Sequence, residues 1–570
     1  MTKLSENAYE VVKKRYFEEG ETRWEEVANR VAIAISANEH DKKWKDIFAT
    51  EINDMLFIPG GRILRNAGKL KQSMLNCGTL PIADSIESIG EAIKNALIMW
   101  KFGAGLGISF SSLRYKGAPL VSGGGESSGM VSFLHAFDAV AHTIETGGQR
   151  RSGCLALLSV RHPEIFDFIN SKIKDKTLSY FNLSVGVDKS FITAVEEDLN
   201  WDLKFAGQII KTIKARDLWE RILEGMVRTG EPGLINIDNL RKNNSFYFQP
   251  ITATNLCGEL PLPDYGMCCL GSLVLPKFIT GTKNTNWKKL EHSINNAVRF
   301  LDNVLDTNYF PIKQAEITTI EARRQGLGVM GLHDYLLAKE IRYGSERSYS
   351  EIDRLFKFIR DTAYTASIRL AEEKGTFPGY RRSEFCSSSF IKKLPSRIRL
   401  EIKKHGIRNC TLLSAQPTGT SSLIPEVSSG IEPIFALAYK RKDRVSDRYY
   451  IHPKLIECIK ENKEKPEWLV DTADLKPEDH LEMQVTIQRF LDNACSKTIN
   501  CPKGFTVSDL SGILLESIQD IKGCTIYVEG SRGEEVLNRM TYEEAKKHVL
   551  ESTSVLSEKD VGCSSGKCDI

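Results

Sequence analysis

Long apolar runs are missing from this chain of 570 residues. No stretch reaches the roughly 18 consecutive apolar residues that a membrane-spanning helix needs. Residues 1–7 also lack the apolar core of a secretory signal peptide. These absences predict a cytoplasmic protein that has no membrane segment.

A surplus of one sign of charge is missing as well, because 77 basic residues face 74 acidic ones and the net charge is +3. This balance gives no support for a protein that coats nucleic acid or lies on a membrane surface. A local pocket lined by amide or basic groups would still suffice for a small anionic substrate. The hydrophobic content of 41% allows a large core, and the length allows about three or four domains or one large barrel.

Cysteine is not scarce, since the chain has 13, an odd number spread along its length. In a chain without an export signal, this pattern favours thiol chemistry or ordinary buried thiols over structural disulfides. No spacing of cysteine and histidine indicates a metal site, and we expect none.

The strongest chemical pattern is the segment Thr-Asn-Leu-Cys-Gly-Glu-Leu-Pro-Leu at 254–262. Its glycine and proline exclude a regular helix, so it predicts a loop tip or a strand end. In an extended run Asn255, Cys257 and Glu259 would share one face. A carboxamide, a buried thiol and a carboxylate would then surround one small volume. A lone buried cysteine in a polar turn is the alternative.

Residues 255–259 resemble the finger loop of ribonucleotide reductases, in which the middle cysteine carries a thiyl radical that abstracts the 3′-hydrogen of a ribonucleotide. The resemblance implies an α/β fold: a ten-stranded α/β barrel around a central finger loop, preceded by a small helical region. It implies a helical region at 1–50, a catalytic barrel at 51–535 and a flexible tail with redox cysteines at 536–570. It also assigns Glu259 as general base on the 3′-hydroxyl group and Asn255 as the residue that orients the substrate.

The N-terminal region is predicted to be helical because apolar residues recur at helical spacing, among them Ala8, Val12, Trp24, Val31 and Ile33. This region is short, and we expect the additional ATP-binding module of many reductases to be missing. Farther along, residues 480–493 predict an amphipathic helix that leads into a strand, and residues 523–532 predict a strand and a turn.

By the same resemblance, Cys77 is one half of a redox pair, and the family register selects Cys268 as its partner. This pair would supply a proton and two electrons and become a disulfide. Alternation along a strand predicts that the neighbouring Cys269 faces the opposite side. A vicinal disulfide between Cys268 and Cys269 is the alternative, whereas metal sites normally leave two or more residues between cysteines.

Two segments predict contact with the substrate. The segment Gln-Pro-Thr-Gly-Thr-Ser-Ser at 416–422 offers hydroxyl and backbone N–H donors, which suit an anion; a plain hydroxyl-rich turn is the alternative. The resemblance makes it the site of the substrate phosphates. The second segment, at 57–68, is a glycine-rich turn beside an apolar strand, and in the family it lies against the substrate. The substrate-binding candidates are Gly61, Thr418, Gly419, Thr420, Ser421 and Ser422.

The resemblance also implies a site for a dNTP or ATP effector, with candidates Asp84, Ser85, Arg114 and Arg150. The Asp-Ser pair can cap a helix that starts near Ile86. A second helix, with apolar residues from 133 to 144, is predicted to end at the two glycines 147–148 and to lead into a mobile basic loop at 149–154. The Gly-x-Gly-x-Gly segment at 103–107 has the wrong spacing for a dinucleotide site, and we reject that interpretation.

The last residues are polar and glycine-bearing, and they carry Cys563 and Cys568. A dithiol on a mobile tether predicts a shuttle that reduces the Cys77–Cys268 disulfide and is itself reduced by a thioredoxin-type partner.

The radical source is predicted to be adenosylcobalamin. The tail has no glycyl-radical motif, the surroundings of Tyr449 and Tyr450 do not match the class I tyrosine relay, and residues 480–500 and 523–532 resemble the cobalamin-dependent class II branch. The chain has no separate Asp-x-His-x-x-Gly cobalamin motif, which this branch does not require. The alternatives are a class I large subunit that needs a radical-generating partner and a catalytically silent nucleotide-binding regulator. The resemblance further implies a homodimer.

Overall fold

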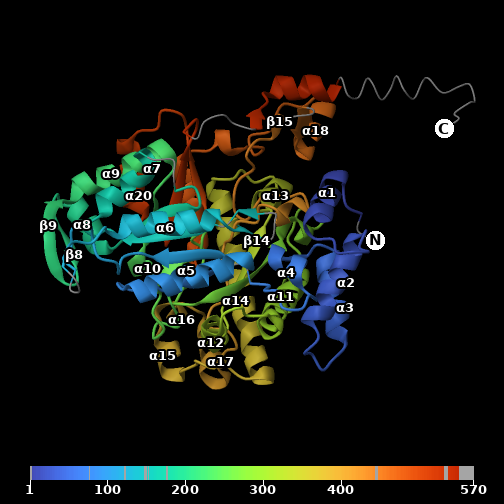
Figure 1. The fold of residues 1–570 in the computed structure, drawn as a ribbon. Coiled ribbons are helices and arrows are strands. Elements are labelled where there is room, and N and C mark those ends of the chain that lie inside the picture. Colours follow the sequence, from blue (N-terminus) through green and yellow to red (C-terminus); the bar gives the residue numbers. More distant parts are fainter. Residues whose placement is uncertain are drawn as a thin grey trace, which may run out of the picture.

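The computed structural model describes residues 3–75, 77–120, 124–146, 150–151, 153–174, 178–442, 447–531 and 537–550 (Figure 1). The chain begins with three helices: α1 (Glu6–Arg15), α2 (Trp24–Ile35) and α3 (Lys43–Asn53). The predicted N-terminal helices are therefore confirmed. Their apolar stripes are buried, with the exception of Ile33, which is 55% exposed. None of the described helices is long and apolar enough to cross a membrane.

The main sheet has ten strands in the order β1-β13-β2-β3-β6-β7-β10-β18-β17, with β14 also paired to β13. The strands are β1 (Phe57–Pro59), β2 (Cys77–Leu80), β3 (Gly105–Ser109), β6 (Cys154–Ser159), β7 (Phe181–Val187), β10 (Gly233–Asn236), β13 (Met267–Val274), β14 (Gln325–Met330), β17 (Thr498–Cys501) and β18 (Gly523–Val528). The predicted ten-stranded α/β fold is thus confirmed.

Two isolated bridges continue this sheet beyond β14. Leu327 in β14 forms a parallel bridge with Leu413, and Ala415 forms one with Cys495, in the segment that leads into β17. The two ends of the sheet are therefore connected through residues 413–415. The hairpin at 253–262 contacts both parts of the sheet, because Thr254 lies against Gly107 of β3 and the Glu259 carbonyl accepts from the Ala494 N–H before β17.

The strand directions divide the sheet into two halves. Strands β2, β3, β6, β7 and β10 run parallel to one another. Strands β18, β17, segment 413–415, β14 and β13 also run parallel to one another. The halves meet in antiparallel pairs, β10 with β18 and β13 with β2.

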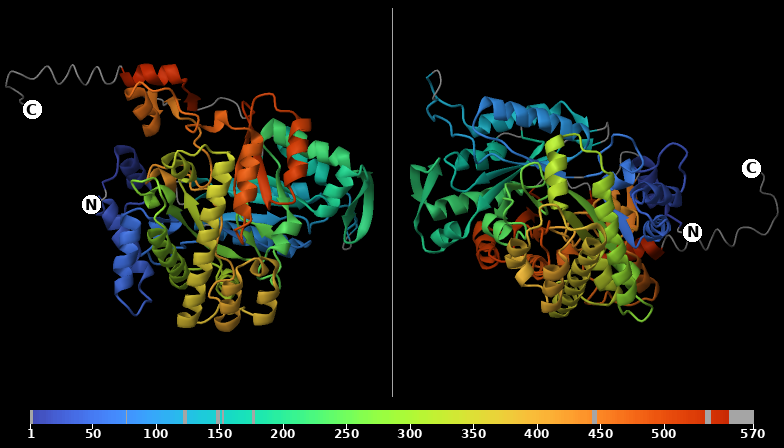
Figure 2. Two further views of the ribbon diagram at one scale, coloured as in Figure 1. Left: turned by 180° about the vertical axis from the view of Figure 1, so that it is seen from behind. Right: turned by 90° about the horizontal axis from the view of Figure 1, so that it is seen from below.

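Helices cover the outside of the sheet. Figure 2 shows the orange-red strands and helices near the C-terminus between the green helices of the first half and the long yellow helix of the second. The principal helices are α5 (Ile86–Lys101), α6 (Met130–His142), α7 (Ile165–Lys174), α8 (Lys189–Glu196), α9 (Ala215–Thr229), α11 (Trp287–Thr307), α12 (Lys313–Ala322), α13 (Leu332–Ala338), α14 (Glu346–Lys374), α17 (Ser396–His405), α19 (Pro477–Gln488) and α20 (Val507–Ser517).

Three local predictions were wrong. The apolar strand predicted within 57–68 is present as β1, but the glycine-rich turn beside it contains a short helix, α4 (Gly61–Asn66). Helix α6 ends at His142, before the two glycines, and is followed by β4 (Glu145–Thr146), which pairs with β5 (Arg150–Arg151). Helix α19 is buried around most of its circumference rather than amphipathic, because it packs between α14, α20 and β17.

Candidate functional site

The candidate site is built on a hairpin whose strands are β11 (Ala253–Thr254) and β12 (Pro261–Leu262). Within its loop, the Asn255 N–H donates to the carbonyl of Leu260 at 3.0 Å, and the Leu260 N–H donates back to the Asn255 Oδ1 at 2.9 Å. The chain turns at residues 256–258, where Gly258 has a φ of +83°. The predicted loop tip is confirmed.

The expectation of an extended run with a buried thiol was wrong. Because the chain turns at 256–258, Asn255 and Glu259 do not share one face with Cys257. Asn255 and Glu259 are buried at the base of the turn, whereas Cys257 is exposed at its tip. The fold therefore presents the thiol to an open space and keeps the two polar side chains in the interior.

Three glycines on neighbouring strands make room for this hairpin. A Cβ atom at Gly107 would overlap the carbonyl oxygen of Thr254, and one at Gly105 would lie 3.2 Å from the Leu256 Cβ. A Cβ at Gly153, just before β6, would lie 2.8 Å from a methyl carbon of Leu256. Glycine lets the hairpin lie directly against the strands, and at position 107 a side chain would prevent this close approach because it would overlap backbone.

Burial raises the pKa of Glu259 to about 7, and the neighbouring Asn255 carboxamide opposes that rise. The backbone carbonyl of Glu259 accepts a hydrogen bond from the Ala494 N–H at 2.8 Å, which ties the hairpin to the other half of the sheet. Among the described residues, neither the Asn255 Nδ2 nor the Glu259 Oε2 has a hydrogen-bond partner, although both are buried. Such atoms suit a polar ligand that would satisfy them.

Cys77 and Cys268 lie directly opposite each other in the antiparallel pair of β2 and β13. Residues opposite each other in such a pair have Cα atoms about 4.5–5.5 Å apart, within the range that a disulfide bridges. Both side chains belong to one cluster with Leu260 of the hairpin. Cys269 faces the opposite side, as alternation predicts, and its thiol contacts the carbonyl of Leu301 in α11 at 3.3 Å.

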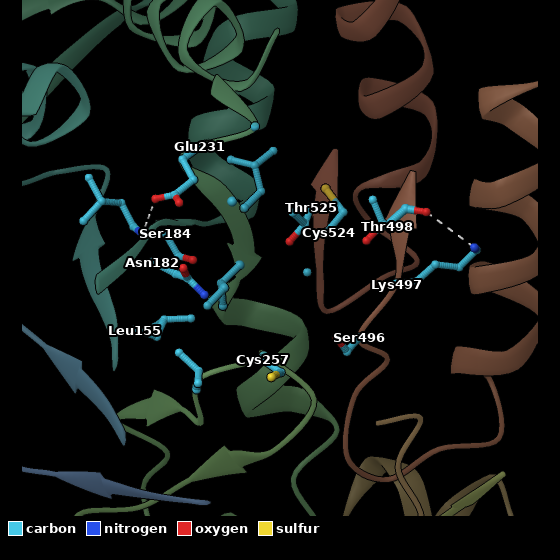
Figure 3. A pocket seen from close by; sticks show the side chains of 18 of the residues that line it. Leu155, Asn182, Ser184, Glu231, Cys257, Ser496, Lys497, Thr498, Cys524 and Thr525 are labelled. Carbon is cyan, nitrogen blue, oxygen red and sulfur yellow. Dashed lines mark hydrogen bonds between the residues drawn. The ribbon is translucent and has the colours of Figure 1, made fainter. Parts of the chain in front are cut away.

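A pocket of about 270 Å³ opens beside the tip of the hairpin, between β7 and β10 on one side and β17 and β18 on the other (Figure 3). Cys257 lies at one end of it. Polar groups from both halves of the sheet line the walls, notably Asn182, Ser184, Thr498 and Thr525. The pocket thus gives a small polar group access to the thiol.

The hydroxyl-rich segment lies beside a larger cavity of about 900 Å³. Thr418 holds the segment in shape, because its Oγ1 accepts from the Gly430 N–H at 2.8 Å and its N–H donates to the Ser429 Oγ at 3.0 Å. A 3₁₀ helix, η2 (Ser421–Leu423), follows. Other substrate candidates, Gly419, Thr420 and Ser422, line the cavity.

Two protein-family models match most of this chain. Residues 75–527 match the model of the ribonucleotide reductase barrel domain, and residues 2–72 match that of the ribonucleotide reductase all-alpha domain. The chain belongs to the ribonucleotide reductase family. It is 36% identical over 564 residues to the vitamin B12-dependent ribonucleoside-diphosphate reductase of Thermoplasma acidophilum, covering 92% of this chain and 71% of that protein.

Other relatives place the chain in the same family. It is 34% identical over 607 residues to the vitamin B12-dependent ribonucleoside-diphosphate reductase of Mycobacterium tuberculosis, covering 100% of this chain and 84% of the relative. To the ribonucleoside-diphosphate reductase large subunit of Caenorhabditis elegans it is 27% identical over 443 residues, covering 70% of this chain and 56% of the relative. The similarity to the vitamin B12-dependent relatives is higher and extends over more of the chain.

The effector candidates of this reductase-family chain lie partly together. The Asp84 carboxylate accepts from the Arg114 Nε at 2.8 Å and from the Arg114 backbone N–H at 3.0 Å. Ser85 caps α5 by accepting the N–H of Ser88, as expected. Arg150 belongs to β5, but its side chain lies outside the described residues, as do Cys563 and Cys568.

The remaining substrate candidate, Gly61, begins α4, and a Cβ there would lie 3.2 Å from the Tyr16 hydroxyl. Sequence reasoning missed the segment at 491–495, whose Ala494 N–H holds the hairpin. It also left the glycines at 105 and 107 without a role, although their period of two on a strand is the signal for a close backbone approach on one face.

Proposed function

We propose that this chain reduces ribonucleotides to 2′-deoxyribonucleotides by a thiyl-radical mechanism. The observation that carries the proposal is the register of Cys77 opposite Cys268 beside the hairpin that presents Cys257. A redox-capable pair and a separate thiol next to a buried carboxylate are the groups that this reaction needs. The names of the relatives favour ribonucleoside diphosphates as substrates.

The residues divide the chemistry among them. The Cys257 sulfur, as a thiyl radical, takes the 3′-hydrogen atom and returns it to the same carbon at the end of the reaction. Glu259 accepts the proton of the 3′-hydroxyl group and gives it back, while Asn255 orients the ribose. The Cys77–Cys268 pair gives up two electrons and two protons and becomes a disulfide, and the 2′-hydroxyl group leaves as water. A carboxyl group with a pKa of about 7 suits this task, because it can exchange a proton near neutral pH.

Adenosylcobalamin is the proposed cofactor. The pocket beside Cys257 fits the adenosyl part of this group, because it combines space next to the thiol with amide and hydroxyl groups from Asn182, Ser184, Thr498 and Thr525. The chemistry that adenosylcobalamin supplies when bound is the formation of an organic radical. The protein's part is to keep Cys257 exposed to that pocket on a rigid hairpin.

Binding energy from the nucleotide would fix the ribose against Cys257. The phosphate contacts are proposed to come from Thr418, Gly419, Thr420, Ser421 and Ser422, with Gly61 against the substrate. A dNTP or ATP effector is proposed at Asp84, Ser85, Arg114 and Arg150. A ribose hydroxyl group could donate to the Asp84 carboxylate, and a phosphate could pair with the Arg114 guanidinium.

Re-reduction of the pair is proposed to run through Cys563 and Cys568 and a thioredoxin-type partner, in a cytoplasmic homodimer that binds neither nucleic acid nor a membrane. This arrangement would let an outside reductant act on a pair that the barrel shields from bulky molecules.

The test is turnover of ribonucleoside diphosphates and triphosphates by the purified full chain with adenosylcobalamin and dithiothreitol and no second subunit. We expect deoxynucleotide product with diphosphates, and none from Cys257→Ala. Product that requires an added radical-generating subunit would instead indicate a class I large subunit. A folded chain that binds nucleotides but yields no product under either condition would indicate a silent regulator.

A further inference from the structure

Arg324 is a deeply buried cation that the proposed mechanism does not use. Its side chain is 2% exposed, and no carboxylate pairs with it in the part of the chain that the structure describes. Its Nη2 donates to the Gln249 Oε1 at 3.3 Å, its guanidinium lies 5.9 Å from the centre of the Phe246 ring, and its Nε has no partner among the described residues. The preceding Arg323, in contrast, pairs with Asp302 at 2.9 Å.

A buried charge without a counter-ion destabilises a fold. The cost indicates that this position has a task that needs a positive charge. The strand register decides which groups Arg324 faces.

The register places Arg324 beside Cys268. Strands β13 and β14 are parallel, with Cys269 opposite Gln325, so the residues one position earlier are also neighbours. The Gln325 side chain points outward and donates to the carbonyl of Val298 in α11. Alternation therefore directs Arg324 inward, to the face that carries Cys268. Cys77, Cys268 and Arg324 form a row across β2, β13 and the start of β14.

The charges around Cys268 agree with this geometry. Burial is the main cause that raises the pKa of Cys268, and Cys269, Cys77 and Cys410 raise it further. Arg324 is the cation among these neighbours, and it opposes the rise. It is therefore the group that favours a thiolate at Cys268.

We infer that Arg324 stabilises the thiolate that Cys268 becomes when the Cys77–Cys268 disulfide is reduced. This inference rests on the proposed redox role of that pair. Cys77 is 9% exposed and Cys268 is 0% exposed, so an incoming thiolate reaches the Cys77 sulfur. A mixed disulfide forms at Cys77, the Cys77–Cys268 bond breaks, and Cys268 leaves as a thiolate opposite the guanidinium. The second thiol of the reductant then releases Cys77, and the reductant is oxidised to its disulfide.

The test measures this exchange directly on the oxidised full chain. After oxidation, mass spectrometry verifies the Cys77–Cys268 disulfide, and its reduction by dithiothreitol is followed from pH 6 to pH 9 in wild type, Arg324→Met, Arg324→Lys and Arg360→Met. Arg360 in α14 is the matched control, because its side chain is also buried and its guanidinium lies 5.2 Å from the centre of the Phe490 ring. Deoxynucleotide formation by the wild type is measured separately, so that failure of the proposed function can be distinguished from failure of this inference.

Reduction is expected to be about threefold or more slower in Arg324→Met, since thiol–disulfide exchange slows as the pKa of the leaving thiol rises. Arg324→Lys should stay within about twofold of wild type, because it keeps the charge, and Arg360→Met should match wild type. A folded Arg324→Met protein that is reduced at the wild-type rate across this pH range would overturn the inference. If Arg324→Met does not fold, Arg324→Gln replaces it, and equal rates for Arg324→Gln and Arg324→Lys would overturn the inference.

Discussion

At the scale of single residues, adjacent cysteines differ in what they can do because a strand alternates its faces. Cys268 faces the interior beside Cys77, whereas Cys269 faces α11. A shift of one position moves a side chain to the other side of the sheet. The two thiols are chemically identical, and only their positions on opposite faces of β13 give them different partners.

Exchanging each cysteine for serine tests this distinction. Cys268→Ser should reduce multiple turnover with dithiothreitol by about 100-fold or more, because the disulfide cannot form. Cys269→Ser should keep turnover and lose on the order of 1 kcal/mol of stability, since a smaller and more polar hydroxyl group replaces a buried thiol that contacts the Leu301 carbonyl. Turnover is measured by steady-state kinetics, and stability is measured by urea unfolding. Equal losses of turnover in the two variants would contradict the assignment.

Glu259 makes the stability of the protein depend on pH. Burial raises its folded pKa to about 7, whereas an unfolded glutamate titrates near about 4.3. Between these values the folded state holds the extra proton, so stability is fully present below the unfolded pKa and falls as the pH rises to about 7. Glu259→Gln should therefore be the more stable protein at pH 8, by an amount on the order of 3 kcal/mol, and the difference should vanish near pH 4.

The measurement is the free energy of unfolding of both proteins across this pH range. Asp264→Asn is the control, because Asp264 follows the same hairpin but has an exposed side chain. A Glu259→Gln protein whose stability runs parallel to wild type at every pH would show that the carboxyl group is not buried as described.

At the scale of elements, the finger hairpin depends on glycines of strands that are distant from it in sequence. Gly105 and Gly107 recur with the period of a strand and face the hairpin. The sequence alone assigned no role to these glycines. It showed only that the segment at 103–107 does not match a dinucleotide-binding motif. Gly107 lets its strand touch the backbone of Thr254, and Gly105 leaves room for the Leu256 side chain.

Gly107→Ala should displace the hairpin, because the new methyl group overlaps the carbonyl of Thr254. A shift of about 1 Å at a reacting group can cost about 100-fold in rate, so we expect a loss of turnover of that size with nucleotide binding retained. Gly512→Ala in α20 is the control, since nothing lies within 4 Å of its Cβ, and it should gain up to about 1 kcal/mol from helix propensity. Full activity of Gly107→Ala would refute the contact.

At the scale of the whole molecule, a buried carboxylate helps connect the two ends of the sheet. Asp492 accepts the N–H groups of Leu412 at 2.7 Å and Leu413 at 2.8 Å, and the hydroxyl group of Tyr364 at 2.8 Å. Segment 413–415 is the one that bridges β14 to the approach of β17. Asp492 therefore joins parts of the chain that are 79 and 80 residues apart in the sequence.

Asp492→Asn should lower the stability by about 2–4 kcal/mol, because an amide N–H group would face backbone donors in the interior. Tyr364→Phe removes a single hydrogen bond to the same carboxylate and should cost only about 1 kcal/mol. Urea unfolding of both variants gives the comparison. Equal, small effects would mean that Asp492 does not hold the segment.

The tail cysteines are predicted to matter only for a bulky reductant. The double variant Cys563→Ser, Cys568→Ser should lose turnover driven by a thioredoxin and its reductase and keep turnover driven by dithiothreitol, because a small dithiol reaches Cys77 directly. Loss of activity with both reductants, or with neither, would contradict a shuttle. The two assays on one preparation of protein serve as controls for each other.

The sequence by itself predicted the N-terminal helices and the loop tip around Cys257, because local periodicity and turn chemistry are specified by neighbouring residues. The family and the choice of Cys268 over Cys269 came from the resemblance to ribonucleotide reductases, and the structure places Cys268 opposite Cys77. Tertiary structure alone decided the burial of Glu259, the exposure of Cys257, the glycine contacts beneath the hairpin, the closing segment at 413–415 and the place of Arg324 beside Cys268. Each of these depends on which strands become neighbours, and that pairing arises from burial and backbone hydrogen bonding across hundreds of residues.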